Sequence, residues 1–503
     1  MKKFIIIFIG LSSISIINAQ DIMDGLRYSM DEIQGTARFR AMSGAFGALG
    51  GDMSAVNINP AGAAIFNLNH ASLTFGLSNE DRDVSYFNEV NSSADTNFDL
   101  NQIGAVFVFR NNYTDSPWKK FSLGFAYDRS ANFNQDWLAS GVNPNTSIGN
   151  YFLEYAQGRR LDEISAFEDE TFSEAYSAIG SLYGFGNQQA FLGFEGYIID
   201  PVNDTDENTQ YTSNINGVDF NQQYSLASRG YNGKLAFNFA TSYEDKIYFG
   251  INLNAHFINY ERSTFLRESN SNETSSVRNV NFGNDLLVTG GGFSFQLGAI
   301  AKITNEFRVG LSYNSPTWYR ISEETSQFLS STRIDESPVT ISPNVINIYP
   351  EYRLQTPGKL TGSLAYVFGN KGLISFDYSL KDYSNIQFRP SSDIFFSNLN
   401  NQINNTLDTA ISYRIGGEYR YKQISFRGGY RFEESPTINN ALFGDLNGYS
   451  AGLGYNFGGM TIDFAFSHSQ RDVNYQLYTV GLTDSAQIDS TFNDFILTLA
   501  FNI

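Results

Sequence analysis

The chain has no cysteine, only three histidines and, after its first twenty residues, no long apolar run. The absence of Cys from 503 residues excludes a disulfide framework, a thiolate metal site and a thiol nucleophile. The histidines, His70, His256 and His468, are far apart in the sequence, which argues against a histidine-based metal site. A bundle of transmembrane helices is also excluded, because each helix needs roughly 20 consecutive apolar residues.

Charged residues are also scarce, at 17% of the chain, and most of them are acidic. Lys and Arg total 33 against 52 Asp and Glu, which gives a formal net charge of −19. This balance argues against nucleic acid and anionic lipid head groups as partners. Phe, Tyr and Gly are instead abundant, with 44, 30 and 44 copies. A soluble protein of this length normally has more Leu, Ala, Lys and Glu.

The first twenty residues have the features of an export signal. Lys2 and Lys3 precede an apolar run of about 14 residues, and the small Ala19 ends the segment. That run is shorter than the roughly 20 residues that span a bilayer. We therefore expect residues 1–19 to be a cleaved signal peptide, with an uncleaved anchor as the alternative. A lipid-anchored lipoprotein is excluded because no Cys follows the run.

Two neighbouring segments near the C-terminus show the clearest strand pattern. Apolar and aromatic residues alternate with polar or small ones over 411–421 and again over 424–432. With a two-residue turn between the segments, paired positions sum to 845, and every outward apolar residue then meets another. The same register places Glu418 opposite Arg427 on the inner face.

This alternation recurs along the chain, and short turns alternate with long connections, as in bacterial barrels. A soluble β-sandwich has no reason to make every second connection short. We therefore predict an all-β fold, a closed antiparallel transmembrane β-barrel of about 14 strands over residues 70–503. The predicted strands are 70–78, 101–110, 119–129, 229–243, 247–261, 286–303, 307–318, 353–368, 372–388, 409–421, 424–433, 447–457, 460–470 and 490–502. The predicted extracellular loops are 79–100, 130–228, 262–285, 319–352, 389–408, 434–446 and 471–489.

The longest predicted loop, residues 130–228, carries two further patterns. Apolar residues within 157–182 recur at spacings of three and four, which predicts one or two small amphipathic helices over the extracellular mouth. The acidic segment 200–208 resembles a loose calcium loop, but it lacks the glycine that an EF-hand requires. We interpret this segment as a solvated acidic loop, with calcium binding as the open alternative.

Residues 20–69 precede the first predicted strand and lack its alternation. The stretch 37–62 is rich in Ala and Gly, and Asn59-Pro60 fixes a turn. Small residues let a backbone pack closely in a confined space, and irregular backbone is tolerated at membrane depth inside a protein lumen. We therefore predict that residues 20–69 form a hatch within the barrel lumen.

The predicted hatch contains two short motifs, Arg40-Ala41-Met42-Ser43-Gly44 and the spacing from Asp52 to Asn59-Pro60-Ala61. In these motifs it resembles the hatch of the FadL/TodX (OMPP1) family of outer-membrane transporters of hydrophobic compounds. Two later blocks, 354–384 and 426–436, are similar to patterns of the same family.

The resemblance implies a monomeric barrel in the outer membrane of a Gram-negative bacterium, surrounded by outer-membrane lipid and without a cofactor. It implies uptake of hydrophobic small molecules of the fatty acid or aromatic hydrocarbon class, with hatch movement and lateral exit at a kinked strand. Lateral exit avoids the release of an apolar solute into water. Asn59, Pro60 and Ala61 carry over as hatch-motif positions, and Gly124 is our candidate for the kink.

Eight side chains are candidate lumenal residues. Phe39, Phe46, Leu49 and Phe66 either contact an apolar substrate or pack the hatch against the wall. Arg414, Glu418, Arg427 and Arg431 either line a polar path for a ligand carboxylate or form a structural ladder across neighbouring strands, which is the interpretation we favour.

The sequence contains no Gly-x-Ser-x-Gly, His-Glu-x-x-His or phosphate-loop motif. We therefore predict a transport protein and not an enzyme, with neither cofactor nor metal. The alternative is an accessory barrel subunit or cargo shuttle of a secretion or outer-membrane assembly complex. In that case the extracellular loops would bind protein partners.

Overall fold

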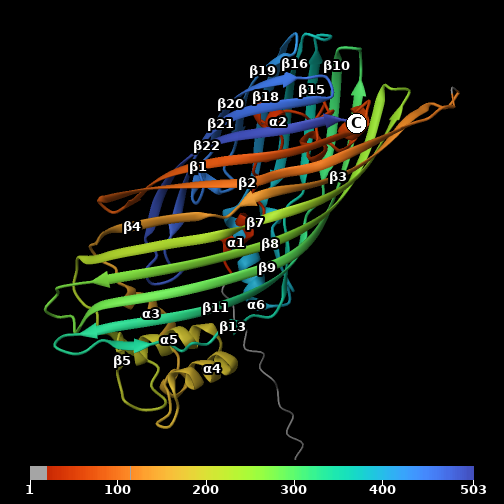
Figure 1. Cartoon of the computed structure of the whole chain (residues 1–503). Helices are drawn as coiled ribbons and strands as arrows, with labels where there is room; N and C mark the ends of the chain where they lie inside the picture. Colours follow the sequence, from red (N-terminus) through yellow and green to blue (C-terminus); the bar gives the residue numbers. More distant parts are fainter. Residues whose placement is uncertain (1–19, 114) are drawn as a thin grey trace, which may run out of the picture.

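The computed structural model describes residues 20–113 and 115–503, so the predicted signal peptide lies outside the described residues. One antiparallel sheet closes on itself, because β1 (His70–Tyr86) pairs with both β2 (Glu89–Arg110) and β22 (Ser485–Asn502). Counting each interrupted strand once gives 14 strands around the barrel, which confirms the predicted fold (Figure 1). The other wall strands are β3 (Trp118–Asn132) with β4 (Gln135–Asn143), β7 (Phe220–Tyr243), β8 (Ile247–Ser269), β9 (Val277–Lys302), β10 (Phe307–Asn314) with β11 (Trp318–Arg333), β14 (Tyr352–Gln355) with β15 (Lys359–Val367), β16 (Gly372–Asp382) with β17 (Gln387–Arg389), β18 (Thr409–Tyr421), β19 (Ile424–Glu433), β20 (Leu446–Asn456) and β21 (Met460–Gln476).

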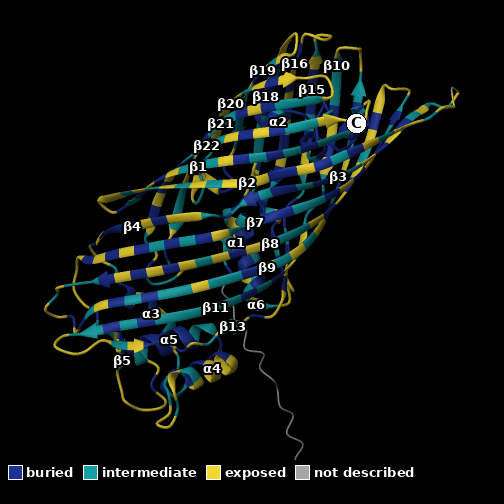
Figure 2. Ribbon diagram, viewed as in Figure 1, coloured by how far each residue is buried: buried dark blue, intermediate teal, exposed yellow. Residues whose placement is uncertain are grey.

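The wall follows the two-residue period of β-structure. Glu418 lies opposite Arg427 and Tyr419 opposite Phe426, so β18 and β19 have the register in which positions sum to 845. Inward side chains are buried and outward ones exposed, which gives the strands the striped pattern of Figure 2. None of the helices within the described ranges is long and apolar enough to cross a membrane.

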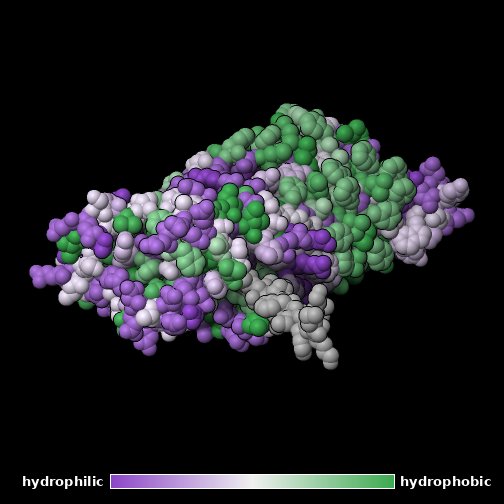
Figure 3. Space-filling view, turned by 90° about the horizontal axis from the view of Figure 1, so that it is seen from below, coloured by the Kyte–Doolittle hydropathy of each residue, from purple (hydrophilic) through white to green (hydrophobic). Residues whose placement is uncertain are grey.

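The exposed side chains of the wall are mainly aromatic and aliphatic, as Phe237, Phe249 and Leu364 illustrate. They cover the part of the barrel nearer the short turns, whereas the end that carries the long connections is mixed and more hydrophilic (Figure 3). We call these two ends the turn end and the loop end. An apolar belt of this kind is the surface that a transmembrane barrel presents to hydrocarbon.

The strands are longer than the sequence pattern predicts, so several predicted loops are in fact hairpins. β1 and β2 stay paired as far as Tyr86 and Glu89, through the predicted loop 79–100. β8 and β9 likewise remain paired through most of 262–285. Beyond the apolar belt the outward face meets water and carries residues such as Asp81, Asp83 and Arg267, while inward residues such as Tyr86 and Leu266 stay buried. The outward apolar stripe therefore ends there, although the backbone ladder continues. The predicted loop extents are wrong for this reason.

Residues 144–219, which we call the cap, lie at the loop end of the barrel (Figure 1). The predicted helical segment 157–182 contains the short helix η3 (Leu161–Glu163) and most of α4 (Phe172–Tyr183), whereas α3 (Ile148–Ala156) precedes it and α5 (Phe185–Glu195) follows it. Helices α3 and α4 each begin at an N-cap side chain, because the Ser147 hydroxyl accepts from the Gly149 N–H and the Thr171 hydroxyl accepts from the Glu174 N–H. The elements of the cap are α3 (Ile148–Ala156), η3 (Leu161–Glu163), α4 (Phe172–Tyr183), α5 (Phe185–Glu195), β5 (Ile199–Pro201) and β6 (Tyr211–Ser213).

Shorter elements fill the remaining connections at the loop end. β12 (Val339–Ile341) and β13 (Asn347–Ile348) connect β11 to β14, and both pair with β11. Helix α6 (Ile394–Thr406) follows β17, and Phe396 on it packs against Phe388 and Tyr352 of the wall. The short helices η4 (Tyr383–Asn385) and η5 (Ile438–Asn440) complete these connections.

The hatch lies inside the barrel, where its helix η2 packs against β7, β8 and β9, and α2 against β20 and β21. Inward-facing glycines let it approach the wall closely. A Cβ at Gly298 would lie 2.0 Å from the side-chain oxygen of Asn59, and one at Gly429 would lie 2.5 Å from the Met42 backbone. The wall is therefore shaped to fit this segment. The hatch elements are α1 (Ile22–Arg27), α2 (Ala37–Ala41), η1 (Ser54–Asn57) and η2 (Pro60–Ile65).

Candidate functional site

The hatch motif Asn59-Pro60-Ala61 is fixed to the wall by hydrogen bonds. The Asn59 side-chain amide donates to the carbonyl of Gly47 at 2.8 Å and to that of Ala299 on β9 at 3.0 Å. Its side-chain oxygen accepts from the Ala61 N–H at 3.1 Å. The Pro60 carbonyl accepts from the Asn238 amide on β7 at 3.0 Å. This one motif therefore ties two turns of the hatch to two strands.

The four predicted apolar contact residues lie in different places. The rings of Phe39 and Phe46 are 5.6 Å apart, and Leu49 belongs to the same buried cluster between hatch and wall. Phe66 lies at the end of the hatch, with its ring 4.9 Å from that of His70. Of the four, Phe39 alone lines the lumenal cavity described below.

The predicted lumenal charges separate into two groups. The buried carboxylate of Glu418 accepts from Arg427 Nε at 2.7 Å and from Arg38 Nε of the hatch at 2.8 Å. In the second group, the guanidinium nitrogens of Arg414 and Arg431 lie 3.3 Å and 3.8 Å from the Glu433 carboxylate. The first group bridges strands and also holds the hatch, while Arg414 of the second group lines the cavity.

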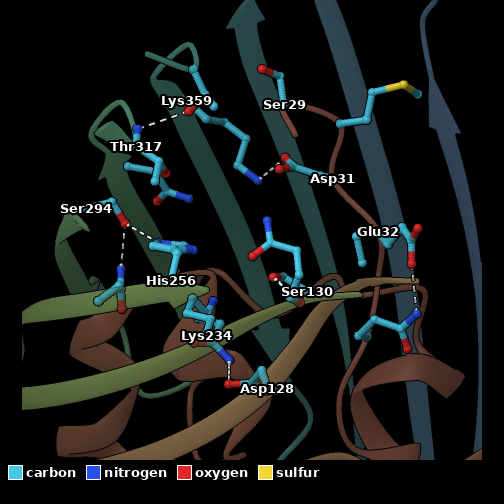
Figure 4. Close-up of a pocket in the computed structure, with 18 of the residues that line it drawn as sticks. Ser29, Asp31, Glu32, Asp128, Ser130, Lys234, His256, Ser294, Thr317 and Lys359 are labelled. Carbon is cyan, nitrogen blue, oxygen red and sulfur yellow. Dashed lines mark hydrogen bonds and ion pairs between the residues drawn. The ribbon is translucent and has the colours of Figure 1, made fainter. Parts of the chain in front are cut away.

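A cavity of about 170 Å³ lies between residues 28–34 of the hatch and the barrel wall (Figure 4). Polar and charged groups dominate its wall side. The hatch contributes the apolar side chains of Ile33, Phe39 and Ile58. The cavity therefore presents cationic groups and an apolar patch to the same small space. Its wall residues with an acidic, basic or imidazole side chain are Asp128, Arg129, Lys234, His256, Lys359, Lys381 and Arg414.

Asp31 of the hatch is held by two lysines of the wall. Its carboxylate lies 2.6 Å from Lys359 Nζ on β15 and 3.0 Å from Lys381 Nζ on β16, and these lysines are cross-strand partners. Burial opposes ionisation of Asp31, but the two ammonium groups hold its pKa well below the ordinary value. Figure 4 shows the Lys359 side chain extending to the Asp31 carboxylate, with the contact marked by a dashed line. The hatch thus supplies the anion that this lysine pair binds.

The opposite side of the cavity is formed by β3, β7, β8 and β9. Lys234 and Asp128 are cross-strand partners there, and Figure 4 shows their side chains directed toward each other. Asp128 also accepts from the Asn57 amide of the hatch at 2.7 Å. His256 lies nearby, with its Nε2 2.8 Å from the Ser294 hydroxyl.

The third wall strand is interrupted between β3 and β4, at Phe133-Asn134. Ladder pairing between β2 and β3 ends at Gln102 and Asp128, and within the described ranges β4 pairs with β7 but not with β2. Side chains bridge the gap, since Asn134 donates to the Asn97 side chain at 2.8 Å. Gly124 is not the kink, because it stays within continuous ladders to β2 and β7. The prediction of a kink at Gly124 is wrong, because the ladder is continuous there and the strand is interrupted at Phe133-Asn134, after a register shift between Arg129 and Ala131.

The hatch contacts this gap directly. The Glu32 carboxylate accepts from the Asn132 N–H, with oxygens at 3.2 and 3.3 Å. Phe133 is buried and directed into the lumen, and its ring packs edge-on against Tyr28 at 5.9 Å. The five residues from Tyr28 to Glu32 therefore touch both the interruption in the wall and, through Asp31, the lysine pair.

Sequence reasoning missed most of the residues around the cavity. The lumenal positions of Lys359 and Lys381 could have been predicted from the sequence. Both occupy inward positions of strands whose outward residues, such as Leu364 and Phe376, alternate clearly. No sequence pattern indicates the contacts of Asp31 and Glu32, because a periodic pattern does not place a hatch side chain against a particular strand.

In the part of the chain that the structure describes, no group of three or more His, Cys, Asp or Glu side chains is placed to hold a metal ion. The acidic segment 200–208 lies in the cap. Asp204, Asp206 and Glu207 are exposed there, whereas Asn208 is buried and donates to the Gln210 carbonyl at 2.8 Å.

We compared the chain with known protein families and its fold with solved structures. A family described as outer membrane protein transport protein (OMPP1/FadL/TodX) matches residues 202–502. No curated protein sequence matches the chain. The toluene transporter TodX of P. putida aligns with a TM-score of 0.53 and 13% identity, covering 93% of this chain and 99% of that one. A Pseudomonas aeruginosa FadL homologue aligns with a TM-score of 0.55 and 12% identity, covering 94% and 99%. At these identities the structural matches establish the shared fold.

Proposed function

Because this chain belongs to the outer membrane protein transport family OMPP1/FadL/TodX, we propose that it takes up hydrophobic small molecules that carry an acidic group. The family consists of transport proteins and not enzymes, and together with the barrel fold it assigns the chain to the Gram-negative outer membrane. The single observation that carries the proposal is the position of the cavity. It lies between a lysine pair and an interruption of the wall, and one hatch segment contacts both.

The chemistry of the cavity supports a fatty acid over an unsubstituted aromatic hydrocarbon. A bare hydrocarbon makes no hydrogen bond to Lys234, Lys359 or Lys381 and cannot compete with the Asp31 carboxylate for the lysine pair. A carboxylate can accept charge-assisted hydrogen bonds from the same ammonium groups. The apolar chain of such a ligand would lie against Ile33 and Phe39 of the hatch.

We propose that the ligand releases the hatch by competition. A substrate carboxylate takes the place of Asp31 on Lys359 and Lys381, so that residues 28–32 lose their anchor on β15 and β16. A ligand shifts a conformational equilibrium only through differential contacts with the two states, and the exchange of one carboxylate for another supplies that difference. Asn59 and Glu418, which hold other parts of the hatch, are not involved in this step.

The proposed exit is the interruption between β3 and β4. Release of the same segment withdraws Glu32 from the Asn132 N–H and Tyr28 from Phe133, leaving mainly side-chain contacts between β2 and β4. Such a gap is the least costly place to part the wall, because no backbone ladder has to break there. The gap borders the exposed apolar side chains of Phe98 and Leu100 on β2, next to hydrocarbon.

The head-group proposal is tested with two ligands of equal chain length. In the variant Lys359→Gln with Lys381→Gln, the affinity of purified protein for radiolabelled dodecanoate should fall about tenfold to hundredfold, because charge-assisted hydrogen bonds are lost. Binding of dodecanol should not fall, because dodecanol has no carboxylate for the lysines to bind. The exposed Lys246, which pairs with Glu244 in a turn, provides the matched control Lys246→Gln.

Failure of the head-group proposal and failure of the uptake proposal give different results in this experiment. If dodecanoate binds the double variant as tightly as the parent protein, carboxylate recognition by this pair is refuted while uptake of apolar compounds stands. If neither ligand binds the parent protein, the uptake proposal itself fails.

The accessory-subunit alternative is favoured by one feature of the loop end. Phe167 in the cap and Ile346 and Ile348 beside it are more than half exposed, at 66%, 61% and 70%. Exposed apolar groups of this kind are frequent in protein interfaces. Purification in mild detergent separates the two functions, since an accessory subunit would retain protein partners in fixed stoichiometry.

A further inference from the structure

Three small residues form a notch in the lipid-facing wall. Gly417 on β18 and Gly428 on β19 are cross-strand partners on the outer face, and Ala451 on β20 continues the row. Added Cβ atoms at the two glycines would have the backbone carbonyls of Leu373 and Ser450 as their nearest neighbours, each at 3.7 Å. The row is therefore open to the outside.

Large side chains surround this notch. Ile415 and Tyr430 form the next outward pair toward the loop end, and Tyr419 and Phe426 the next pair toward the turn end. All four are exposed, by 38% to 57%. A hollow of about 530 Å³ runs along the outside of the wall here and reaches Phe368 and Lys371 at the turn end. Its apolar lining matches hydrocarbon and not water.

Lys371 lines the turn-end opening of this hollow, and a second lysine, Lys422, lies in the turn of the neighbouring strand. Lys371 lies in the turn before β16 and Lys422 in the turn after β18, which are neighbouring strands (Figure 1). Residues 368–372 and 421–424 contain no Asp or Glu. The chain as a whole carries a formal charge of −19, so this positive site is a local exception to its charge balance.

The dimensions fit one acyl chain. Gly417 precedes Lys422 by five residues, which is about 17 Å along a strand at roughly 3.4 Å per residue. With the usual tilt of about 40°, this distance is about half of the ~25 Å apolar band of a barrel. A chain whose head group lies at the turns would thus end at the notch.

We propose that this hollow binds one glycerophospholipid of the leaflet at the turn end, with an acyl chain in the Gly417–Gly428–Ala451 notch and its phosphate on Lys371 and Lys422. The site is independent of the lumen and of the transported ligand. It would hold one face of the barrel in a fixed lipid environment. The net negative charge disfavours anionic head groups elsewhere on the molecule, which makes this position selective.

Native mass spectrometry of delipidated protein, titrated with 1-palmitoyl-2-oleoyl-phosphatidylglycerol, tests the site. The parent protein should retain one lipid at the lowest concentrations. Gly417→Leu with Gly428→Leu should need about tenfold more lipid for the same occupancy, because the notch is filled. Lys371→Gln with Lys422→Gln should abolish the preference for this lipid over diacylglycerol with the same chains.

Gly362→Leu is the matched control. Gly362 is also an open outward glycine, but its neighbours are Leu311 and Tyr378 and it does not line the hollow. Ala451→Leu fills the notch from the next strand if the glycine variant does not fold. The proposal is overturned if both notch variants retain lipid as the parent and Gly362→Leu do, or if a second copy of the chain occupies the face in place of lipid.

Discussion

At the scale of single residues, Glu418 joins the barrel wall to the hatch. The alternation of β18 and β19 predicts its position opposite Arg427, and the structure adds Arg38 of the hatch to the same carboxylate. The buried carboxylate has three guanidinium partners, Arg38, Arg420 and Arg427. Of these, Arg38 belongs to the hatch and Arg427 to the neighbouring strand, so their shared carboxylate links hatch and wall. The residue therefore serves the ladder and also anchors α2.

Glu418→Gln should destabilise the folded barrel by on the order of 3–5 kcal/mol, because Arg38 of the hatch loses its carboxylate partner and Arg427 keeps only Asp463. Urea unfolding in detergent, followed by tryptophan fluorescence, measures the loss. Arg229→Gln is the control, since Arg229 and Asp136 are both more than half exposed and 4.0 Å apart. That control should change stability by less than about 0.5 kcal/mol. Equal effects of the two changes would contradict the anchoring role.

At the scale of elements, the broken third strand is the feature most closely tied to the proposed exit. β3 and β4 share the partner β7, so the break leaves one edge of the wall intact and opens only the edge toward β2. The opening is covered by Phe133 from the wall and by Tyr28 from the hatch. A strand that ends in a bulge is thus placed where the hatch can control it.

A disulfide across this gap should stop lateral exit without affecting ligand binding. Asn97→Cys with Asn134→Cys places the bridge where the two side chains form a hydrogen bond of 2.8 Å, and the chain has no other Cys to interfere. Influx of dodecanoate into liposomes should fall in the oxidised form and recover on reduction. Each single variant controls for the substitutions. Undiminished influx through the oxidised protein would refute exit at this gap.

At the scale of the whole molecule, the barrel and the hatch behave as complementary parts. Inward glycines at Gly298 and Gly429 receive the hatch, and buried polar residues of the wall satisfy its backbone groups, since Asp377 accepts from the Phe46 N–H and Asn238 donates to the Pro60 carbonyl. Such a fit closes the lumen, so transport through it requires part of the hatch to move. The proposed release of residues 28–32 is a local movement that leaves the Asn59 contacts in place.

A second engineered bridge distinguishes local from global hatch movement. Ser43→Cys with Ser450→Cys joins the hatch to β20, where the two hydroxyl oxygens are 2.8 Å apart. If only residues 28–32 move, uptake by the oxidised protein should equal uptake by the reduced protein. A loss of uptake on oxidation, restored by reduction, would show that the part of the hatch around Ser43 must also move.

The sequence by itself determined the barrel, its strand order and the register of its hairpins. These features follow from a two-residue period and short turns, both of which are local, so the alternation alone is enough to pair Glu418 with Arg427. Only the tertiary structure decided which wall residues meet the hatch, where the third strand breaks and how far the strands continue beyond the membrane. Those outcomes depend on contacts such as that of Asp31 with Lys359, between residues more than 300 positions apart, for which no local pattern exists.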